Sequence, residues 1–259
     1  MKKLIALFFV AVLAFTFAAC QEAEPHYEYG YGVSYGLVHG HYVGKIEVVV
    51  DKDDKVVSAK IDEYFLPYNV GQVALTEEQI ANLPTDVLAV VGSRGTSYYS
   101  KYVSVAGTLF MGTVSGESGS QSIVYSATGI ANIEDWVKVE ANAKAYVEAV
   151  EADQVFTANA DGTRNALPYG SSNVKIGWTK SATGYWTNPA SYPLGWGGNM
   201  KAIVDAIIGT TMDATEEDLV KDATWSIGDI VTGATLTDFT DYYLLAQQAY
   251  NNALATKVE

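Results

Sequence analysis

Two neighbouring stretches near the start of the chain have the pattern of paired strands. Residues 42–50 (YVGKIEVVV) and 56–64 (VVSAKIDEY) are rich in β-branched residues, and apolar residues alternate at Val57, Ala59 and Ile61. A charged turn, residues 51–55 (DKDDK), separates them. The pattern predicts a β-hairpin with a polar loop of about five residues, and any fold for this chain must therefore include an antiparallel pair.

Helical and strand patterns alternate through the rest of the sequence. Apolar residues recur at helical spacing in residues 132–151 and again after Leu236, where Thr237 or Asp238 would cap the terminal helix. We predict an α+β fold, an antiparallel sheet with flanking helices, elaborated by insertions. The remaining elements predicted are strands at 98–106, 108–114 and 121–125, and helices at 76–81 and 201–208.

The first residues have the organisation of a secretory signal. Lys2 and Lys3 precede a run of 16 mostly apolar residues, which is short for a membrane span, and small residues then precede Cys20. This ending resembles the lipobox of bacterial lipoproteins, which implies cleavage after residue 19, lipidation of Cys20 and anchoring to a membrane outside the cytoplasm. An ordinary signal peptide with an incidental cysteine is the alternative. As the only cysteine, Cys20 excludes an intrachain disulfide.

The organisation that follows is a signal peptide over residues 1–19, a tether over 20–39 and one domain over 40–259 with an insertion in its middle. Removing residues 1–19 takes away two lysines and no acid, so the net charge changes from −14 to −16. An acidic chain argues against nucleic acid as a partner.

A short stretch near the C-terminus, residues 229–235 (DIVTGAT), combines groups that suit an anion. Gly233 permits a tight backbone, Ala234 keeps the surface low, and the hydroxyls of Thr232 and Thr235 would stand beside a helix N-terminus. The simpler interpretation is a helix cap, which is the common role of such residues before an apolar stripe.

The same stretch resembles the flavinylation motif of FMN-binding domains, as in the C subunit of sodium-pumping NADH:quinone reductases and the Rnf G subunit. The resemblance implies an FMN-binding-domain-like fold and covalent FMN on Thr235 through a phosphoester bond. It also implies that a magnesium-dependent flavin transferase attaches the FMN, with Asp229, Thr232 and Gly233 positioning the loop.

Two other segments resemble parts of the same family. Residues 40–44 (GHYVG) match its Gly-x-Tyr-x-Gly entry to the first hairpin. Residues 65–69 (FLPYN) stand where the family often has His-x-Glu-Thr, and there Tyr68 could stack on a ring. Residues 192–200 (YPLGWGGNM) resemble a Gly-Leu-Trp loop that lies against the flavin in the quinone-reductase subunits. The ring-lining residues implied are Leu194, Gly195, Trp196, Tyr185, Trp186 and Tyr68.

Other constellations are weak. The pair His39 and His41 lacks an evident third metal ligand, so we predict no metal site. Residues 126–129 (SATG) and 181–184 (SATG) lack a Gly before Ala-Thr, and we interpret both as turns rather than second flavin sites. The acidic stretch 213–218 is predicted to be a solvated first helical turn.

The resemblance implies a lipid-anchored flavoprotein that relays electrons between a donor and an acceptor, and so an electron carrier more than a stand-alone enzyme. The resemblance extends to flavin lipoproteins of extracellular electron-transfer chains. The alternative is a non-redox lipoprotein that binds a ligand or a surface through the aromatic-rich segment 161–199.

Overall fold

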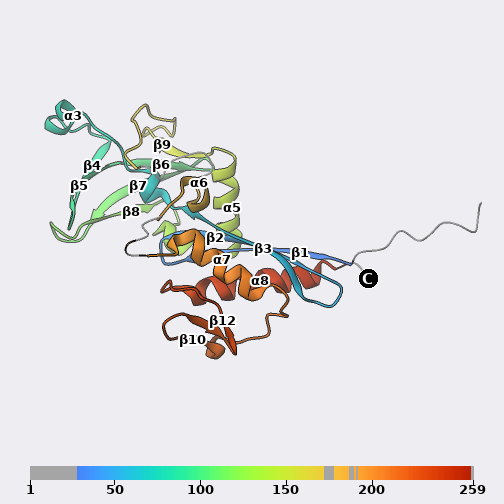
Figure 1. Cartoon of the computed structure of the whole chain (residues 1–259). Coiled ribbons are helices and arrows are strands. Elements are labelled where there is room, and N and C mark those ends of the chain that lie inside the picture. The colour runs from blue at the N-terminus through green and yellow to red at the C-terminus, as the bar shows by residue number, and fades with distance from the viewer. Residues whose placement is uncertain (1–27, 172–177, 187–189, 191, 258–259) are drawn as a thin grey trace, which may run out of the picture.

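The computed structural model describes residues 28–171, 178–186, 190 and 192–257 (Figure 1). The signal peptide and Cys20 therefore lie outside the described residues. The fold is mixed α and β, and every strand pair in its sheets is antiparallel. This confirms the α+β class predicted from the sequence.

A three-stranded sheet in the order β1-β2-β3 forms the centre of the molecule. Strands β2 (Tyr42–Val50) and β3 (Val56–Phe65) confirm the predicted hairpin, with a register shift at Val49/Val50. Strand β1 (Gly30–Val38) pairs with β2 along its whole length, so the predicted tether is wrong for residues 30–38.

The glycines of β1 explain why the sequence pattern failed there. Helix α8 (Phe239–Ala255) crosses the strand so closely that a Cβ on Gly32 would lie 2.1 Å from the carbonyl oxygen of Ala249. A Cβ on Gly30 would likewise lie 2.0 Å from the carbonyl oxygen of Ala253. Close backbone contact therefore replaces the side-chain alternation that marks an ordinary half-buried strand.

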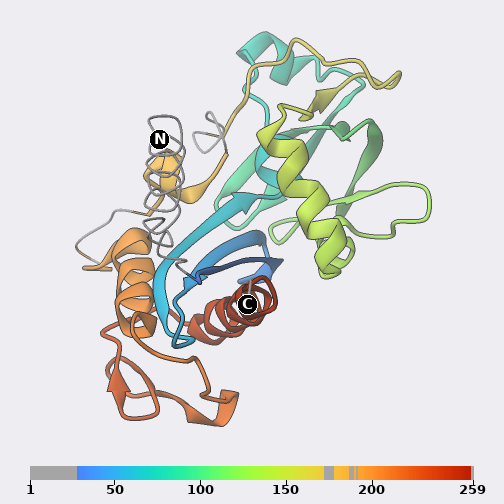
Figure 2. The ribbon, with the colours of Figure 1, turned by 90° about the vertical axis from the view of Figure 1, so that its right-hand side faces the viewer.

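Helices cover both faces of the central sheet (Figure 2). On one face, α8 and α7 (Gly195–Ile207) enclose a core with Ile46, Val48 and Phe65. On the other face, α5 (Glu140–Glu151) packs in a second core with Val43 and Tyr64. The alternation of β2 sends Tyr42, Ile46, Val48 and Val50 into the first core and Val43 into the second.

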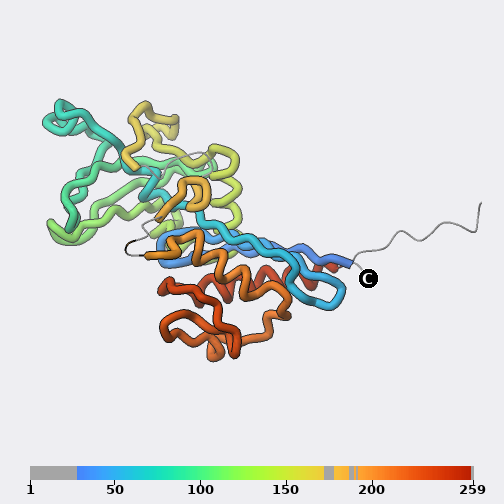
Figure 3. The backbone as a smooth tube through the Cα atoms, in the orientation of Figure 1, coloured from blue at the N-terminus to red at the C-terminus, as the bar shows by residue number. Residues whose placement is uncertain are grey.

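The chain leaves the central sheet after β3, builds a second lobe and returns to α7 (Figure 3). That lobe contains a four-stranded sheet in the order β8-β7-β6-β9, the hairpin β4-β5 and α5. Its remaining elements are α2 (Pro67–Val70), α3 (Glu77–Ala81), β4 (Val87–Gly92), β5 (Gly95–Ser100), β6 (Tyr102–Val105), β7 (Thr108–Ser115), β8 (Ser122–Ser126), α4 (Ile133–Trp136) and β9 (Val155–Ala158).

Local sequence signals were correct at some helix ends and incomplete at others. Thr76 and Gln79 form a reciprocal capping box at α3, as that segment predicts. The single helix predicted over 132–151 is instead two, α4 and α5, because the backbone at Val139 is extended. Asn142 bridges the break by donating to the carbonyl of Trp136 at 2.9 Å.

A small third sheet, which the sequence did not indicate, packs beside α8. It contains β10 (Leu219–Lys221), β11 (Trp225–Ile227) and β12 (Ile230–Val231), and follows a 3-10 turn, η1 (Glu216–Asp218). The ring of Trp225 stacks on Phe239 of α8 with centroids 5.0 Å apart. This sheet carries residues 229–235 to the first part of α7, where Thr235 meets Asn199.

Candidate functional site

The stretch 229–235 forms the last turn and exit of the small sheet. Asp229 is exposed at the turn between β11 and β12. The hydroxyl of Thr232 donates to the carbonyl of Trp225 at 2.8 Å and accepts from the N–H of Ala234 at 3.0 Å. Gly233 has φ +78°, which favours glycine. These contacts turn the backbone sharply, so that Ala234 is buried and Thr235 half-exposed.

One buried side chain, Asn199 of α7, holds the backbone at Thr235. Its Oδ1 accepts from the N–H groups of Thr235 at 2.7 Å and Leu236 at 3.2 Å, and lies 3.3 Å from the Thr235 hydroxyl. Its Nδ2 donates to the carbonyl of Gly195 at 2.7 Å. Asn199 therefore connects the Thr235 loop to the first turn of α7.

The expected helix N-terminus beside Thr235 is absent. Helix α8 begins at Phe239 with Asp238 as its N-cap, and Asp238 makes no side-chain cap hydrogen bond. The N–H groups of Thr235 and Leu236 are used by Asn199 instead. The prediction of a phosphate site on the dipole of that terminal helix is wrong, because α8 begins only at Phe239 and the N–H groups next to Thr235 already have an acceptor.

A surface cleft of about 290 Å³ lies at the start of α7. The rings of Trp186 and Tyr192 meet on one wall with centroids 4.0 Å apart, and both side chains are partly exposed. Gly197 leaves open space where a Cβ would stand. The cleft is lined by Trp186, Tyr192, Pro193, Leu194, Gly195, Trp196, Gly197 and Gly198.

A second, smaller cavity of about 30 Å³ connects this cleft to the Thr235 loop. Trp186 and Trp196 line both spaces, while Asn199, Leu236 and Thr237 line only the smaller one. The structure therefore brings the predicted residues Leu194, Gly195, Trp196 and Trp186 together around one cleft. Trp186 and Trp196 also line the smaller cavity, where Leu236 and Thr237 follow Thr235 in the chain. These contacts come from three separate parts of the chain.

Beneath the smaller cavity lies a buried ion pair between Glu63 of β3 and Lys180 of α6 (Lys180–Thr183). The Lys180 Nζ is 2.7 Å from Glu63 Oε2, and both side chains are nearly inaccessible to solvent. The other oxygen, Oε1, accepts hydrogen bonds from the Trp196 indole N–H and the Tyr242 hydroxyl. Oε1 is thus hydrogen-bonded, and the charge of Oε2 is balanced by the ammonium of Lys180, as a buried charge requires.

Lys180 is also surrounded by aromatic rings. Its Nζ lies 3.7 Å from the ring centroid of Tyr42 and 5.0 Å from that of Tyr185. Burial lowers the pKa of Lys180, and the charge of Glu63 opposes that shift. A fixed positive charge therefore lines the smaller cavity in an otherwise acidic protein.

Two of the predicted aromatic residues lie elsewhere. The hydroxyl of Tyr185 pairs with that of Tyr42 at 3.2 Å, and its ring packs on Phe65 below the cleft. Tyr68 lines a different cleft, in the second lobe, with His41. The structure does not bring these two rings to the cleft beside Trp186.

The sequence reasoning missed Asn199, Glu63 and Lys180. Their segments, GGNMKAIV, AKIDEYF and WTKSATG, contain other polar residues beside them, so no local pattern marked these three side chains as buried. Their pairing follows from burial, which only the fold shows. The segment 181–184, interpreted as a turn, is part of α6 and its C-cap, Gly184.

The two histidines of the β1–β2 turn do not form a metal site. His39 pairs with Asp238, whereas the Nδ1 of His41 lies 3.5 Å from Glu134 in the second lobe. Within the described ranges, no group of three or more His, Cys, Asp or Glu side chains could hold a metal ion. No helix in that same part of the chain is long and apolar enough to cross a membrane.

Comparison with protein-family models, curated proteins and solved structures finds no match to this chain. The candidate site is therefore judged on its own geometry and on the residues of its motif.

Proposed function

We propose that Thr235 carries FMN through a phosphoester bond and that the protein relays electrons through this flavin. The observation that carries the proposal is the position of Thr235. Its side chain is half-exposed, its backbone is held by Asn199, and the neighbouring residues Leu236 and Thr237 line a cavity that adjoins an aromatic cleft. An attachment residue needs this combination of a fixed backbone and an accessible hydroxyl.

The residues of the cleft fit a flat ring system. Trp186 and Tyr192 offer ring faces for stacking, and Gly197 leaves the opposite surface low. The volume of about 290 Å³ is at the small end of the range for ligand sites. FMN, when bound, would supply the redox chemistry, while the chain supplies orientation and electrostatics.

Attachment of FMN needs a second enzyme, because among the described residues no base is hydrogen-bonded to the Thr235 hydroxyl. The side chain beside its hydroxyl is the amide of Asn199, which can accept a hydrogen bond but cannot take up a proton at neutral pH. In the proposed transfer, the Thr235 oxygen bonds to the FMN phosphorus of FAD, the phosphorus–oxygen bond to AMP breaks, and AMP leaves. The magnesium-dependent flavin transferase supplies the base and the metal.

Lys180 and the aromatic cluster support the redox role. The ammonium of Lys180 would stabilise the reduced, anionic form of a nearby flavin, but Glu63 at 2.7 Å offsets much of that charge. The membrane anchor in this proposal is lipidated Cys20, which would keep the flavin at an extracytoplasmic membrane surface near its electron donor and acceptor.

The deciding experiment is co-expression of the mature chain with a flavin transferase, followed by mass spectrometry and in-gel flavin fluorescence. Wild type and Thr235→Ser should carry one FMN, and Thr235→Ala none. Thr237→Ala is the matched control, since Thr237 lies two residues after Thr235, lines the smaller cavity and should not affect attachment. Covalent flavin on Thr235→Ala, or none on wild type, would overturn the assignment.

A non-redox lipoprotein that binds a ligand or surface is the second candidate. Trp186, Tyr192 and Leu194 are each about 40% exposed around one cleft, and clustered exposed apolar groups commonly mark binding surfaces. A wild-type product without flavin, whose Trp186 fluorescence responds to an added ligand, would favour this function over the first.

A further inference from the structure

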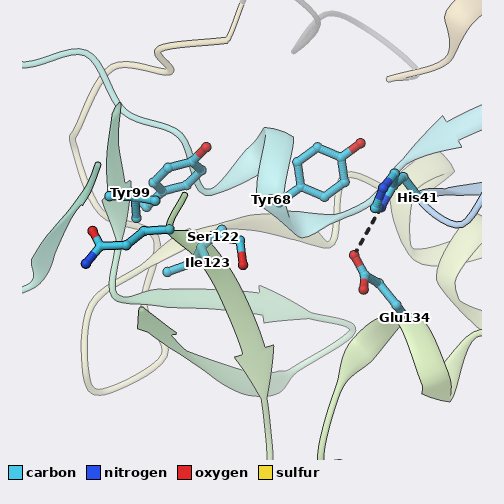
Figure 4. A pocket seen from close by; sticks show the side chains of 8 residues that line it. His41, Tyr68, Tyr99, Ser122, Ile123 and Glu134 are labelled. Atoms are coloured by element: carbon cyan, nitrogen blue, oxygen red, sulfur yellow. Dashed lines mark ion pairs between the residues drawn. The ribbon is translucent and has the colours of Figure 1, made fainter. Parts of the chain in front are cut away.

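The second lobe contains a cleft that shares no residue with the cavities around Thr235. Its volume is about 270 Å³. It lies between the β4–β5 hairpin, β8 and the short helices α2 and α4, and the β1–β2 turn closes one end through His41 (Figure 4). The lining residues are His41, Tyr68, Val90, Tyr99, Gln121, Ser122, Ile123 and Glu134.

The walls of this cleft suit an aromatic ring. Figure 4 shows the rings of Tyr68 and Tyr99 on one side, with Ser122 and Ile123 beside them. Ile123 and Val90 add aliphatic surface, and Tyr68 is largely buried by its surroundings. A flat apolar ligand gains most from such walls, because aromatic side chains pack on its face or edge.

The polar atoms gather at the His41 end. The Nδ1 of His41 lies 3.5 Å from Glu134 Oε1, and its ring meets Tyr68 edge-to-face with centroids 5.9 Å apart. The second ring nitrogen of His41, Nε2, is able to accept a hydrogen bond when the proton of the imidazole is on Nδ1. A hydroxyl on the ligand is the group that such an acceptor binds.

We propose that this cleft binds a small molecule with a hydroxylated aromatic ring, whose ring packs against Tyr68 and Tyr99 and whose hydroxyl donates to His41. This site is separate from the proposed flavin attachment and does not depend on it. The two histidines of one turn, separated by Gly40, then line different sites: His39 lines the smaller cavity and His41 lines this cleft.

The probes are 2-naphthol and 2-methoxynaphthalene, titrated into the flavin-free mature protein by isothermal calorimetry. Wild type should bind 2-naphthol at one site, and the methoxy compound about three- to tenfold more weakly, because it has no hydroxyl to donate. His41→Phe keeps a ring at that position and should remove this preference without changing the affinity for 2-methoxynaphthalene.

Ser122→Trp places a large ring at the exposed mouth of the cleft and should abolish binding of both probes. Val57→Trp is the matched control, since Val57 is exposed at the far end of β3 from the cleft; it should bind like wild type. Melting curves of each variant show that it is folded. Any of three results overturns the proposal. They are no saturable binding to wild type, binding to Ser122→Trp as strong as to wild type, and the same ratio of affinities for the two probes in wild type and His41→Phe.

Discussion

The Oδ1 atom of Asn199 accepts the backbone N–H of Thr235 at 2.7 Å, across 36 residues of sequence. The same oxygen accepts the N–H of Leu236, so one buried amide satisfies two donors of an irregular loop. The position of Thr235 therefore depends on α7 as much as on its own motif.

Replacing this amide should loosen the loop and destabilise the fold. We expect Asn199→Ala to lower the free energy of unfolding by about 2–3 kcal/mol, because buried N–H groups lose their acceptor. Asn142→Ala is the control: Asn142 also sits on a helix but makes one hydrogen bond, to the Trp136 carbonyl, and should cost about 1 kcal/mol. Urea denaturation measures both. Equal losses for the two variants would contradict the role given to Asn199.

The ion pair of Glu63 and Lys180 gives a second prediction. Lys180→Met leaves the Glu63 carboxylate buried without its counter-charge, and should destabilise the protein by about 3–5 kcal/mol. Glu63→Gln/Lys180→Met removes both charges but keeps an oxygen that can accept from Trp196 and Tyr242. We expect the double variant to recover most of the loss.

An ion pair on the surface serves as the control for these two variants. Lys144 and Glu148 lie 3.8 Å apart on the exposed side of α5, and Lys144→Met should cost less than about 1 kcal/mol. Denaturation midpoints of all four proteins test the scheme. A double variant that is as unstable as Lys180→Met alone would show that the charge itself is not the cause.

The close approach of α8 to β1 predicts a sharp contrast between two glycines of one strand. In Gly32→Ala the new Cβ would meet backbone atoms of α8 at 2.1 and 2.2 Å, so we expect a loss of about 3 kcal/mol or more. In Gly36→Ala it would lie 3.1 Å from the mobile end of Leu245, and the loss should stay below about 1 kcal/mol. Thermal melts of both variants measure this contrast. Similar stabilities of the two variants would contradict the close packing of α8 on β1.

Alkaline pH should destabilise the protein. Burial raises the pKa of Tyr68 and that of Tyr243 to about 12, and also raises the pKa of Tyr42, Tyr125 and Tyr242. Between pH 10 and 12 the unfolded tyrosines lose protons that the folded ones keep, so the stabilisation present below pH 10 is lost as pH rises. The lowered pKa of Lys180 has the opposite effect and makes the protein more stable as pH rises, but it is a single group and the tyrosines are several.

Urea midpoints at pH 8, 10 and 11, with tyrosinate absorbance as a second readout, measure this effect. Tyr243→Phe removes one of the buried hydroxyls and should show a shallower decline than wild type. A midpoint that stays constant or rises above pH 10 would contradict the expected sign.

Local signals in the sequence predicted those elements whose stabilising contacts are between residues close together in the chain. The β2–β3 hairpin follows from alternation and a polar turn, and α3 follows from the capping residues Thr76 and Gln79. The motif at 229–235 and the loop before α7 were also visible, because their glycines and hydroxyls lie close together in the chain. Strand β1 was missed, since its partner surface is a helix more than 200 residues away.

The sequence by itself determined the strand alternation, the apolar faces of α7 and α8, and the motif at residues 229–235. Tertiary structure alone decided what those residues contact. Asn199 reaches Thr235, and Glu63 meets Trp196 across 133 residues, because buried polar groups pair with whatever group the fold brings near. For the same reason Tyr68 and Trp186, which the sequence analysis predicted to line a single flavin ring, line two different clefts.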